Sequence, residues 1–519
     1  MLEWGVPPDD PLPRVIRPRS VLFALPAAGR RWSAGLRAAG AVALAGGGVV
    51  LAGHADVALF VTFGAFAVLY GEGRPYRVRA WVVLTAAALL LLSAGLGAAA
   101  GSLGGNVVVV VTVVAVLAVF VVDALRLGPP GALFFALVCG GAMVATEAGA
   151  HPLPLLLCTA LGGLSSALVS MAGFVADRRK PERVAVERAV RAVDAFLRAG
   201  HAGAEARHAA GSAISAAWGA VHDAGDRPEL AATLIAAHRR FADASGADDE
   251  TPLPLPRPAV GYRLRRSATL RSHAMLTALR VGGTCAAAGA LSASLGLTRP
   301  HWAVLSTLVV LQQGTDRVRA NVRGLQRFAG TAAGLGLFAL LIQLAPTGLA
   351  LIATIAVLQF CIELFVPRNY AVAVVFITPV ALLAGGATAS TPVIRDRFVE
   401  TALGVALAVL SQYLVAPNAH RTTFRWTESR VRAAALTLLA NAPAMPARRD
   451  LQFELEGATR AAVDSAHNDL AWTRRHWPAH AALVHLGYDL LAACWAAAPG
   501  ERLTDEWKQA FQPAQTRRS

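Results

Sequence analysis

Charged residues are scarce in this chain of 519 residues, and lysine is nearly missing. Only 16% of the residues are charged, whereas a soluble domain carries roughly 25%. Lys180 and Lys508 are the only lysines, so the formal net charge of +15 comes almost entirely from arginine. A chain that is 55% hydrophobic and so poor in charge does not have the composition of an ordinary soluble domain.

Motifs for nucleotide binding, metal binding and covalent catalysis are also absent. The sequence contains no Walker A loop, no His-Glu-x-x-His helix and no Gly-x-Ser-x-Gly elbow. Four of the five cysteines lie inside apolar segments, at spacings that fit neither a metal site nor a disulfide framework: Cys139, Cys158, Cys285 and Cys361. We therefore expect no enzyme activity, no catalytic residue, no metal ion and no cofactor.

The basic residues lack the arrangement that nucleic-acid binding needs. A nucleic-acid binder gathers its positive charge on one soluble face, beside groove-reading or aromatic motifs. Here much of the excess falls in the N-terminal arm and in loops beside apolar blocks, as the positive-inside rule requires. The expected partner is a lipid bilayer, and nucleic acid is not expected.

Apolar blocks of about 15 to 25 residues dominate the chain, which is the length that crosses a bilayer as a helix. They predict an all-α membrane protein with about twelve transmembrane helices, six before and six after a polar stretch. The expected spans are 33–53, 56–71, 80–100, 105–123, 130–148 and 152–175, followed by 274–296, 300–314, 325–345, 348–366, 369–387 and 395–416.

The second set of six spans repeats features of the first at an offset of about 240 residues. Leu36-Arg37 matches Leu279-Arg280, and Arg77-Val78-Arg79-Ala80 matches Arg317-Val318-Arg319-Ala320. Asp123, late in the fourth span, falls opposite Glu363, late in the tenth. Because six is an even number, both copies enter the membrane from the same side, which predicts two parallel repeats.

A polar, helical region follows each set of spans, so the repeating unit includes a cytoplasmic part. In the first such region, helices are expected at 181–200, 204–224 and 228–245, before a Pro-rich linker. The expected divisions are a cytoplasmic N-terminal arm (1–32), a first six-helix membrane domain (33–175), a cytoplasmic helical domain with linker (176–273), a second six-helix membrane domain (274–416) and a C-terminal cytoplasmic helical domain (417–519).

Arginine sets the expected orientation. Clusters such as Arg77 with Arg79 and Arg178 with Arg179 all fall on one side of the spans, which the positive-inside rule makes cytoplasmic. We expect a multi-pass protein of the inner (plasma) membrane with both termini in the cytoplasm. Arg299, Arg395 and Arg397 fall on the outer side and break this pattern.

Charges in or near apolar spans are the candidates for function, because each costs roughly 2.5 to 3.5 kcal/mol at mid-bilayer and should face protein or water. The alternative is that an arginine snorkels to the headgroups, or that Arg395 and Arg397 pair with Asp396 and Glu400. The candidates for a substrate path are Arg280, Arg299, His301, Arg323, Arg327, Arg395 and Arg397, and the candidates for proton coupling or for a structural role are Asp123, Glu363 and Glu400.

Three short motifs resemble the aromatic acid exporter family, which is also described as fusaric acid resistance protein-like (FUSC) or as an integral membrane bound transporter domain. They are Arg299-Pro300-His301-Trp302, Arg327-x-x-Gly330-Thr331-x-x-Gly334 and Arg397-x-x-Glu400-Thr401-x-x-Gly404. The resemblance covers about 272–416 well and 30–175 only in architecture, since Ala87 stands near the position of Arg327 and the first copy has no Arg-Pro-His-Trp run.

The resemblance implies efflux of small organic anions, mainly aromatic carboxylic acids, through an arginine-lined path between the two six-helix halves. Arginine suits this task because its planar fork meets a carboxylate with two hydrogen bonds. Two other classes stay open: a membrane scaffold or envelope accessory protein without transport, and a membrane-embedded enzyme, which the missing motifs disfavour. Whether the chain forms a homo-oligomer or has a periplasmic or cytoplasmic partner is also open.

Overall fold

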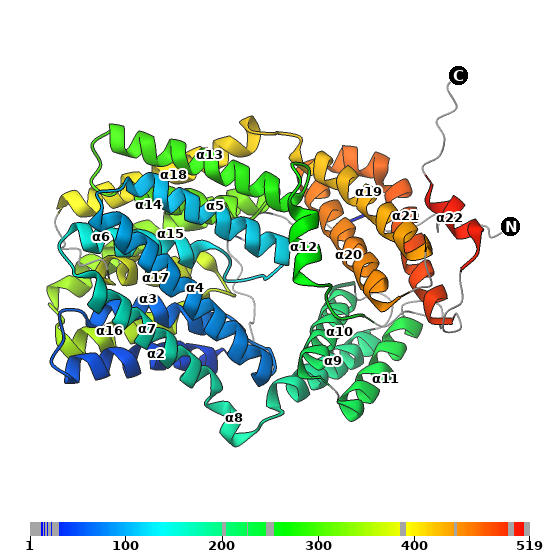
Figure 1. Cartoon of the computed structure of the whole chain (residues 1–519), viewed down its shortest axis with the longest axis horizontal. Helices are drawn as coiled ribbons and strands as arrows, with labels where there is room; N and C mark the ends of the chain where they lie inside the picture. Colours follow the sequence, from blue (N-terminus) through cyan, green and yellow to red (C-terminus); the bar gives the residue numbers. More distant parts are fainter. Residues whose placement is uncertain are drawn as a thin grey trace.

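Every regular element that the computed structural model describes is a helix (Figure 1). The structure describes residues 31–199, 204–225, 227–244, 254–384, 391–440, 444–496 and 503–512. It also describes the single residues at positions 12, 13, 15, 18 and 22. The first series is α2 (Trp32–Leu51), η1 (Ala58–Phe60), α3 (Val61–Ala65), η2 (Phe66–Leu69), α4 (Tyr76–Ser102), α5 (Val107–Leu125), α6 (Leu133–Glu147), α7 (Pro152–Met171) and α8 (Gly173–Ala176).

The second apolar series follows the crosswise helix α12 (Val260–Ser267) and has a similar order of lengths. It consists of α13 (His273–Ser294), α14 (His301–Leu311), α15 (Arg317–Gln343), α16 (Gly348–Phe365), α17 (Tyr370–Ala384) and α18 (Thr391–Leu414). In Figure 1 both apolar series fill the left of the molecule, and most of their helices run side by side toward the polar helices on the right.

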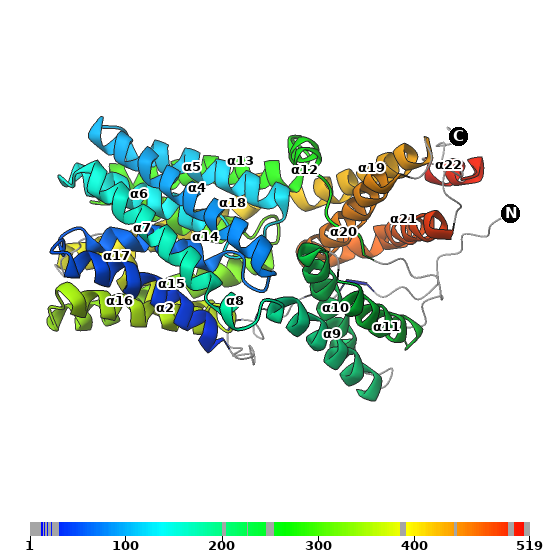
Figure 2. The same cartoon turned by 60° about the horizontal axis from the view of Figure 1, so that its bottom comes forward.

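Two polar bundles complete the chain. The first contains α9 (Lys180–Ala199), α10 (Ala204–Ala224) and α11 (Pro228–Ala244), which confirms the three helices expected there. The second contains α19 (Ala419–Ala440), α20 (Met445–Asn468), α21 (Leu470–Ala496) and α22 (Asp505–Phe511). Figure 2 shows the two bundles as separate groups on the same side of the apolar helices.

The number of long membrane helices is lower than predicted. Seven described helices are long and apolar enough to cross a bilayer, or eight if α18 and α19, bent by 60° at their junction, count as one span. The four other predicted spans are shorter apolar helices at 58–69, 133–147, 301–311 and 370–384. The α14 helix, with 11 residues, extends only about 17 Å, whereas the hydrocarbon core is about 30 Å thick.

Helix pairing follows the same scheme in the two apolar series. The α4 helix packs against α6 and α7, and α15 packs against α17 and α18. Likewise α3 contacts α7, and α14 contacts α18. Between the series, α2 packs against α16, and α13 packs against α5. The first helix of each series thus contacts the helix that follows the longest helix, α15 or α4, of the other series.

Glycines allow several of these helices to approach closely. A Cβ on Gly97 of α4 would lie 2.1 Å from the Cys139 carbonyl oxygen of α6, and one on Gly330 of α15 would lie 2.4 Å from the Ala371 carbonyl oxygen of α17. Such contacts exclude any side chain, as is common where membrane helices pack tightly. Close packing in the pairs α4–α6 and α15–α17 therefore depends in both cases on a glycine.

Candidate functional site

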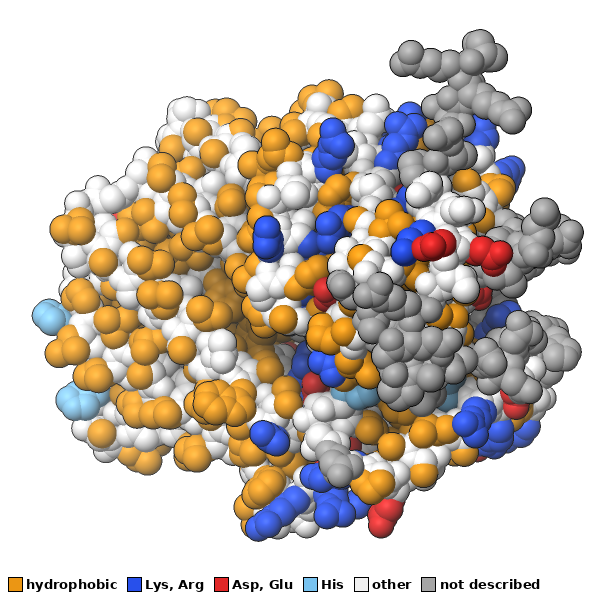
Figure 3. Space-filling model, turned by 45° about the vertical axis from the view of Figure 1, so that its right-hand side comes forward, with side chains coloured by type: hydrophobic (Ala, Val, Ile, Leu, Met, Phe, Trp, Pro, Cys, Tyr) orange, Lys and Arg blue, Asp and Glu red, His pale blue; other side chains and the backbone are white. Residues whose placement is uncertain are grey.

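A large cavity lies where the apolar helices meet the polar bundles, and we call it the junction cavity. Its volume is about 820 Å³. Both apolar series, α12 and α20 contribute to its wall, and its charged lining residues are Asp123, Arg126, Arg257, Arg266, Arg319, Arg323, Glu363, Arg460 and Asp464. Figure 3 shows a hollow near this level, with hydrophobic side chains over the apolar helices and Lys or Arg where the polar part begins.

Arginines outnumber carboxylates in the junction cavity, so its walls favour an anion. Three of the arginines are already paired: Arg266 with Glu454 at 2.6 Å, Arg319 with Asp316 at 3.2 Å and Arg126 with Glu456 at 3.7 Å. The guanidinium of Arg323 lies 4.0 Å from the ring centre of Tyr370. Arg323 therefore lines the cavity with its guanidinium stacked on an aromatic ring, and it has no carboxylate partner among the described residues.

Asp123 and Glu363 both reach the junction cavity, from α5 and α16. Asp123 lies 3.9 Å from Nε2 of His273, whose Nδ1 lies 3.8 Å from Asp464 of the second bundle. Glu363 instead lies 3.6 Å from Arg31 at the start of α2. The two carboxylates thus occupy related places in different surroundings, and each contacts the apolar series to which it does not belong.

A second, smaller hollow lies deeper among the apolar helices, and we call it the apolar chamber. Its volume is about 40 Å³, and Phe63, Phe66, Phe134 and Trp302 supply its aromatic walls. Arg299, His301 and Gln359 are its polar lining residues. Nδ1 of His301, Nε1 of Trp302 and Oε1 of Gln359 are buried without a hydrogen-bond partner in the described structure, so the chamber offers unused polar groups to a ligand.

Three apolar side chains line both hollows and separate them. Phe134 comes from α6 of the first series, while Ile362 of α16 and Ile377 of α17 come from the second. The junction cavity and the apolar chamber therefore lie one behind the other between the two series. Apolar side chains at such a position can form a gate, as apolar constrictions do in channels.

The polar wall of the chamber is held in place by α18. Oδ2 of Asp396 accepts hydrogen bonds from the backbone N–H and the hydroxyl of Thr298, at 3.3 and 3.0 Å. Oε1 of Glu400 accepts from the backbone N–H of Arg299 at 3.0 Å. Because Asp396 and Glu400 are one helical turn apart, a single face of α18 fixes the start of the Arg299-Pro300-His301-Trp302 segment.

Arg397 of α18 packs against the same segment. Its guanidinium lies 3.7 Å from the ring centre of Trp302, and its Nε and Nη1 are buried without a hydrogen-bond partner in the described structure. Arg327, 2% exposed, lies within electrostatic range of Arg397. Neither arginine lines the two hollows, so Arg397 affects the chamber through its contact with Trp302.

Two of the other predicted path residues have local structural partners. Arg280 donates to Oε1 of Gln412 at 2.7 Å and to the carbonyl oxygen of Val415 at 2.9 Å, and thereby satisfies the end of α18. Arg395 is 71% exposed and pairs with Asp396 at 2.9 Å. The pairing alternative describes Arg395. Arg397 stacks on an indole and makes no ion pair within 4 Å among the described residues, although Glu400 is near enough to interact with its charge.

The sequence did not predict that Phe134, Gln359, Ile362 or Ile377 would line the site. Gln359 carried a usable signal, since it is an amide inside the apolar segment 348–366 and intramembrane polar groups are costly. The three apolar residues carried none. In sequence, a residue that faces the other series resembles one that faces lipid.

Comparisons with known proteins identify the part of the chain that contains this polar wall. Residues 273–411 match the fusaric acid resistance protein-like family model. The predicted resemblance is confirmed for this fusaric-acid-resistance-like region, which runs from α13 to α18 and carries Arg299, His301 and Glu400.

A relative extends the likeness over most of the chain. The uncharacterized membrane protein YvaC of Bacillus subtilis (strain 168) is 25% identical over 544 residues, which covers 88% of this chain and 84% of that protein. No solved structure matches. The chain is therefore a membrane protein with a fusaric-acid-resistance-like region, to which the first apolar series and the two polar bundles are added.

Proposed function

We propose that this protein is a membrane transporter that carries small organic anions, aromatic carboxylates among them, out of the cytoplasm between its two apolar series. The arrangement of the two hollows carries the proposal. Arg323 lines the junction cavity, Arg299 lines the apolar chamber, and Phe134, Ile362 and Ile377 line both. An anion with a flat apolar body fits this sequence of surfaces better than an inorganic ion, because three phenylalanines and a tryptophan line the chamber.

The repeated helix pairing supports two parallel six-helix halves, 33–175 and 274–416, as the transport unit. The reciprocal contacts α2–α16 and α13–α5 are what an axis along the membrane normal would produce. In this proposal the short helices at 58–69, 133–147, 301–311 and 370–384 are shielded from lipid by the longer ones. The halves are not equivalent, because the charged support of Arg397 and Glu400 belongs to the second alone.

Efflux needs no ATP under this proposal. An inside-negative potential of about 100 mV favours the exit of each negative charge by about 2.3 kcal/mol. The proposed topology places both termini and the two polar bundles, 176–273 and 417–519, in the cytoplasm of a cell bounded by an inner membrane. Proton coupling through Asp123 or Glu363 is the alternative energy source, and a scaffold without transport is the alternative function.

Flux through purified protein tests the proposal. The full chain is reconstituted in liposomes loaded with labelled phthalate, an aromatic dianion that crosses a bare bilayer slowly, and a potassium gradient with valinomycin sets the potential. We expect efflux that exceeds that of protein-free liposomes and accelerates when the interior is made negative. Efflux no faster than in empty liposomes at either sign of potential would favour the scaffold.

A further inference from the structure

An exposed corner at the end of α7 has no part in the proposed path. After α7 ends, the chain makes the short helix α8 and then enters α9. Val175 of α8 is 90% exposed and Phe174 is 38% exposed. The next basic residues, which are exposed as well, are Arg178, Arg179 and Lys180. Apolar and cationic side chains therefore stand together at the level where the apolar helices end.

The first residue of α4, Tyr76, packs against this corner. The ring of Tyr76 packs edge-on against Phe174 with 5.7 Å between centres, and the guanidinium of Arg178 lies 5.0 Å from the Phe174 ring centre. Arg77 and Trp81 of α4 are exposed as well, but they lie on the opposite face of that helix from Tyr76 and Arg79, which are buried. We name the set Phe174, Val175, Arg178, Arg179 and Lys180 the α8 corner.

The cations of the α8 corner are not neutralised from within. Asp177 is the carboxylate beside them in sequence, but its Oδ2 accepts from Arg183 at 2.6 Å and its Oδ1 accepts from the backbone N–H of Arg179 at 3.0 Å. Within the described part of the chain, no carboxylate lies within 4 Å of the side-chain nitrogens of Arg178, Arg179 or Lys180. Their charge is therefore available to a partner.

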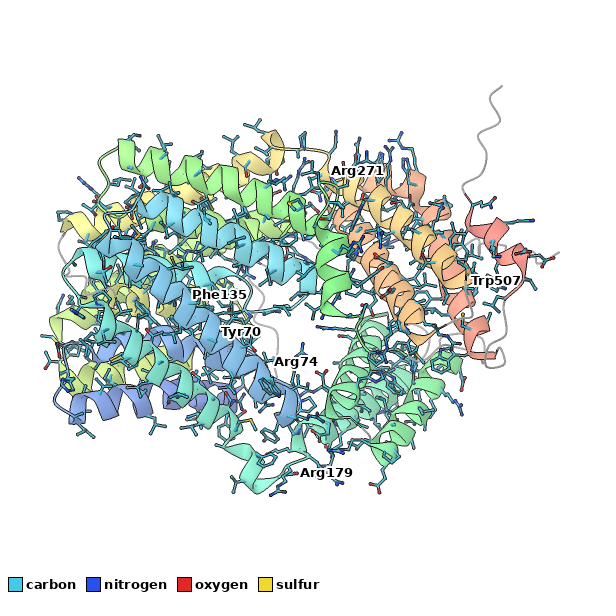
Figure 4. The ribbon with its side chains drawn as sticks, viewed as in Figure 1. Tyr70, Arg74, Phe135, Arg179, Arg271 and Trp507 are labelled. Atoms are coloured by element: carbon cyan, nitrogen blue, oxygen red, sulfur yellow. The ribbon has the colours of Figure 1, made fainter. Side chains whose placement is uncertain are left out.

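The height of the corner identifies that partner. Figure 4 shows Arg179 and Arg271 on opposite edges of the molecule, both at the boundary between the apolar helices and the polar bundles. Leu270, beside Arg271, is 70% exposed. Exposed tryptophan and arginine at one level mark the headgroup region of a bilayer, and apolar side chains such as Val175 then reach the acyl chains.

We propose that the α8 corner binds anionic phospholipids of the leaflet on the side of the polar bundles. Phosphate groups meet Arg178, Arg179 and Lys180, while Phe174 and Val175 contact the glycerol backbone and upper acyl chains. Among the described helices of the second apolar series, none corresponds to α8, because α18 bends directly into α19. The proposal concerns the outer edge of the molecule and does not depend on transport.

Native mass spectrometry of the detergent-solubilised full chain tests this site. Phosphatidylglycerol and phosphatidylcholine with identical acyl chains are titrated onto the wild type, the triple variant R178Q/R179Q/K180Q and the control R188Q/R191Q/R198Q. The control removes the same charge from exposed positions of α9 that are further along the first bundle. We expect the triple variant to bind phosphatidylglycerol at least tenfold more weakly, since each cation near the surface contributes up to about 1 kcal/mol, with the control unchanged and phosphatidylcholine weak throughout.

Several outcomes would overturn the site. Equal binding of the two lipids to the wild type, equal loss in the control, or no loss in the triple variant would each do so. Displacement of phosphatidylglycerol by equimolar glycerol 3-phosphate would show a general anion site instead. If the triple variant does not fold, the salt dependence of wild-type binding tests the proposal. Phosphatidylglycerol binding to the wild type should weaken with added salt, and salt-independent binding would contradict the proposal.

Discussion

Glu400 holds the backbone of Arg299: its Oε1 accepts the Arg299 N–H at 3.0 Å, from the middle of α18 to the loop before α14. This bond joins two motifs that lie a hundred residues apart, Arg299-Pro300-His301-Trp302 and Arg397-x-x-Glu400. The motifs are one structural unit, in which α18 supports and the loop lines the chamber.

Removal of this support should destabilise the chain. Glu400→Ala leaves the partly buried Arg299 N–H without this acceptor, which costs up to about 1 to 3 kcal/mol, whereas Glu400→Gln keeps a carbonyl acceptor and should cost less. Thermal unfolding in detergent, followed by tryptophan fluorescence, should rank wild type, then Gln, then Ala. An Ala variant as stable as wild type would mean that the Arg299–Glu400 bond does not hold the loop.

The planar guanidinium of Arg397 should be essential for the chamber. Arg397→Lys keeps the charge but loses the flat face that lies on Trp302, and such a substitution is not conservative at a stacked site. We expect phthalate efflux to fall at least severalfold while expression stays normal. The matched control is Arg395→Lys, at an exposed residue paired only with Asp396, which should transport like wild type; equal loss in both variants would contradict this role.

The three apolar residues that line both hollows, Phe134, Ile362 and Ile377, should limit the rate of anion efflux. Phe134→Ala removes the aromatic ring that lines both, and we expect faster efflux with weaker discrimination among anions. The neighbouring Phe135, whose ring lies 5.7 Å from that of Tyr70, lines neither hollow; Figure 4 shows Phe135 close to Tyr70. Phe135→Ala should therefore alter stability and not selectivity, and the reverse pattern would place the gate elsewhere.

Asp464, in the second bundle outside the membrane helices, should make stability depend on pH. Burial, reinforced by nearby Asp316, raises its pKa from 3.8 to about 7. The folded chain then keeps a proton that the unfolded chain releases above about pH 4, so the contribution of this group to stability falls as pH rises from about 4 to about 7. The side chain is 16% exposed, which lessens the effect.

The measurement is the unfolding temperature of wild type and Asp464→Asn at mildly acidic and mildly alkaline pH. Wild type should lose stability relative to the variant as pH rises through about 7. Asp243→Asn, at an exposed position of α11, serves as the control. A constant difference between wild type and Asp464→Asn across this range would show that Asp464 ionises normally.

Much of the architecture follows from local sequence signals. The helices α9 to α11 begin and end within a residue or two of the predicted limits, because Pro181 and Pro228 mark first turns and the polar periodicity is regular. The four short apolar helices were predicted as full spans, since composition alone does not show that a helix such as α14 is covered by protein.

The site was predictable only in part. Arg299, His301 and Arg323 were predicted from charge in an apolar setting, and they do line the hollows. Arg280 looked the same in sequence, yet it binds carbonyl groups at the end of α18. Whether an arginine meets a cavity, an aromatic ring or a helix end depends on contacts between helices far apart in the chain, which local patterns do not encode.

Blocking the route between the two series tests the central claim most directly. Ile377→Cys places a thiol at a residue that lines both hollows, in a chain whose Cys361 is replaced by Ala. A charged methanethiosulfonate reagent should abolish phthalate efflux in this variant. Efflux should be unaffected in the matched variant Leu382→Cys, which lies on the same helix outside the lining residues. Unchanged efflux through a chain shown by mass spectrometry to be modified at position 377 would contradict a path between the series.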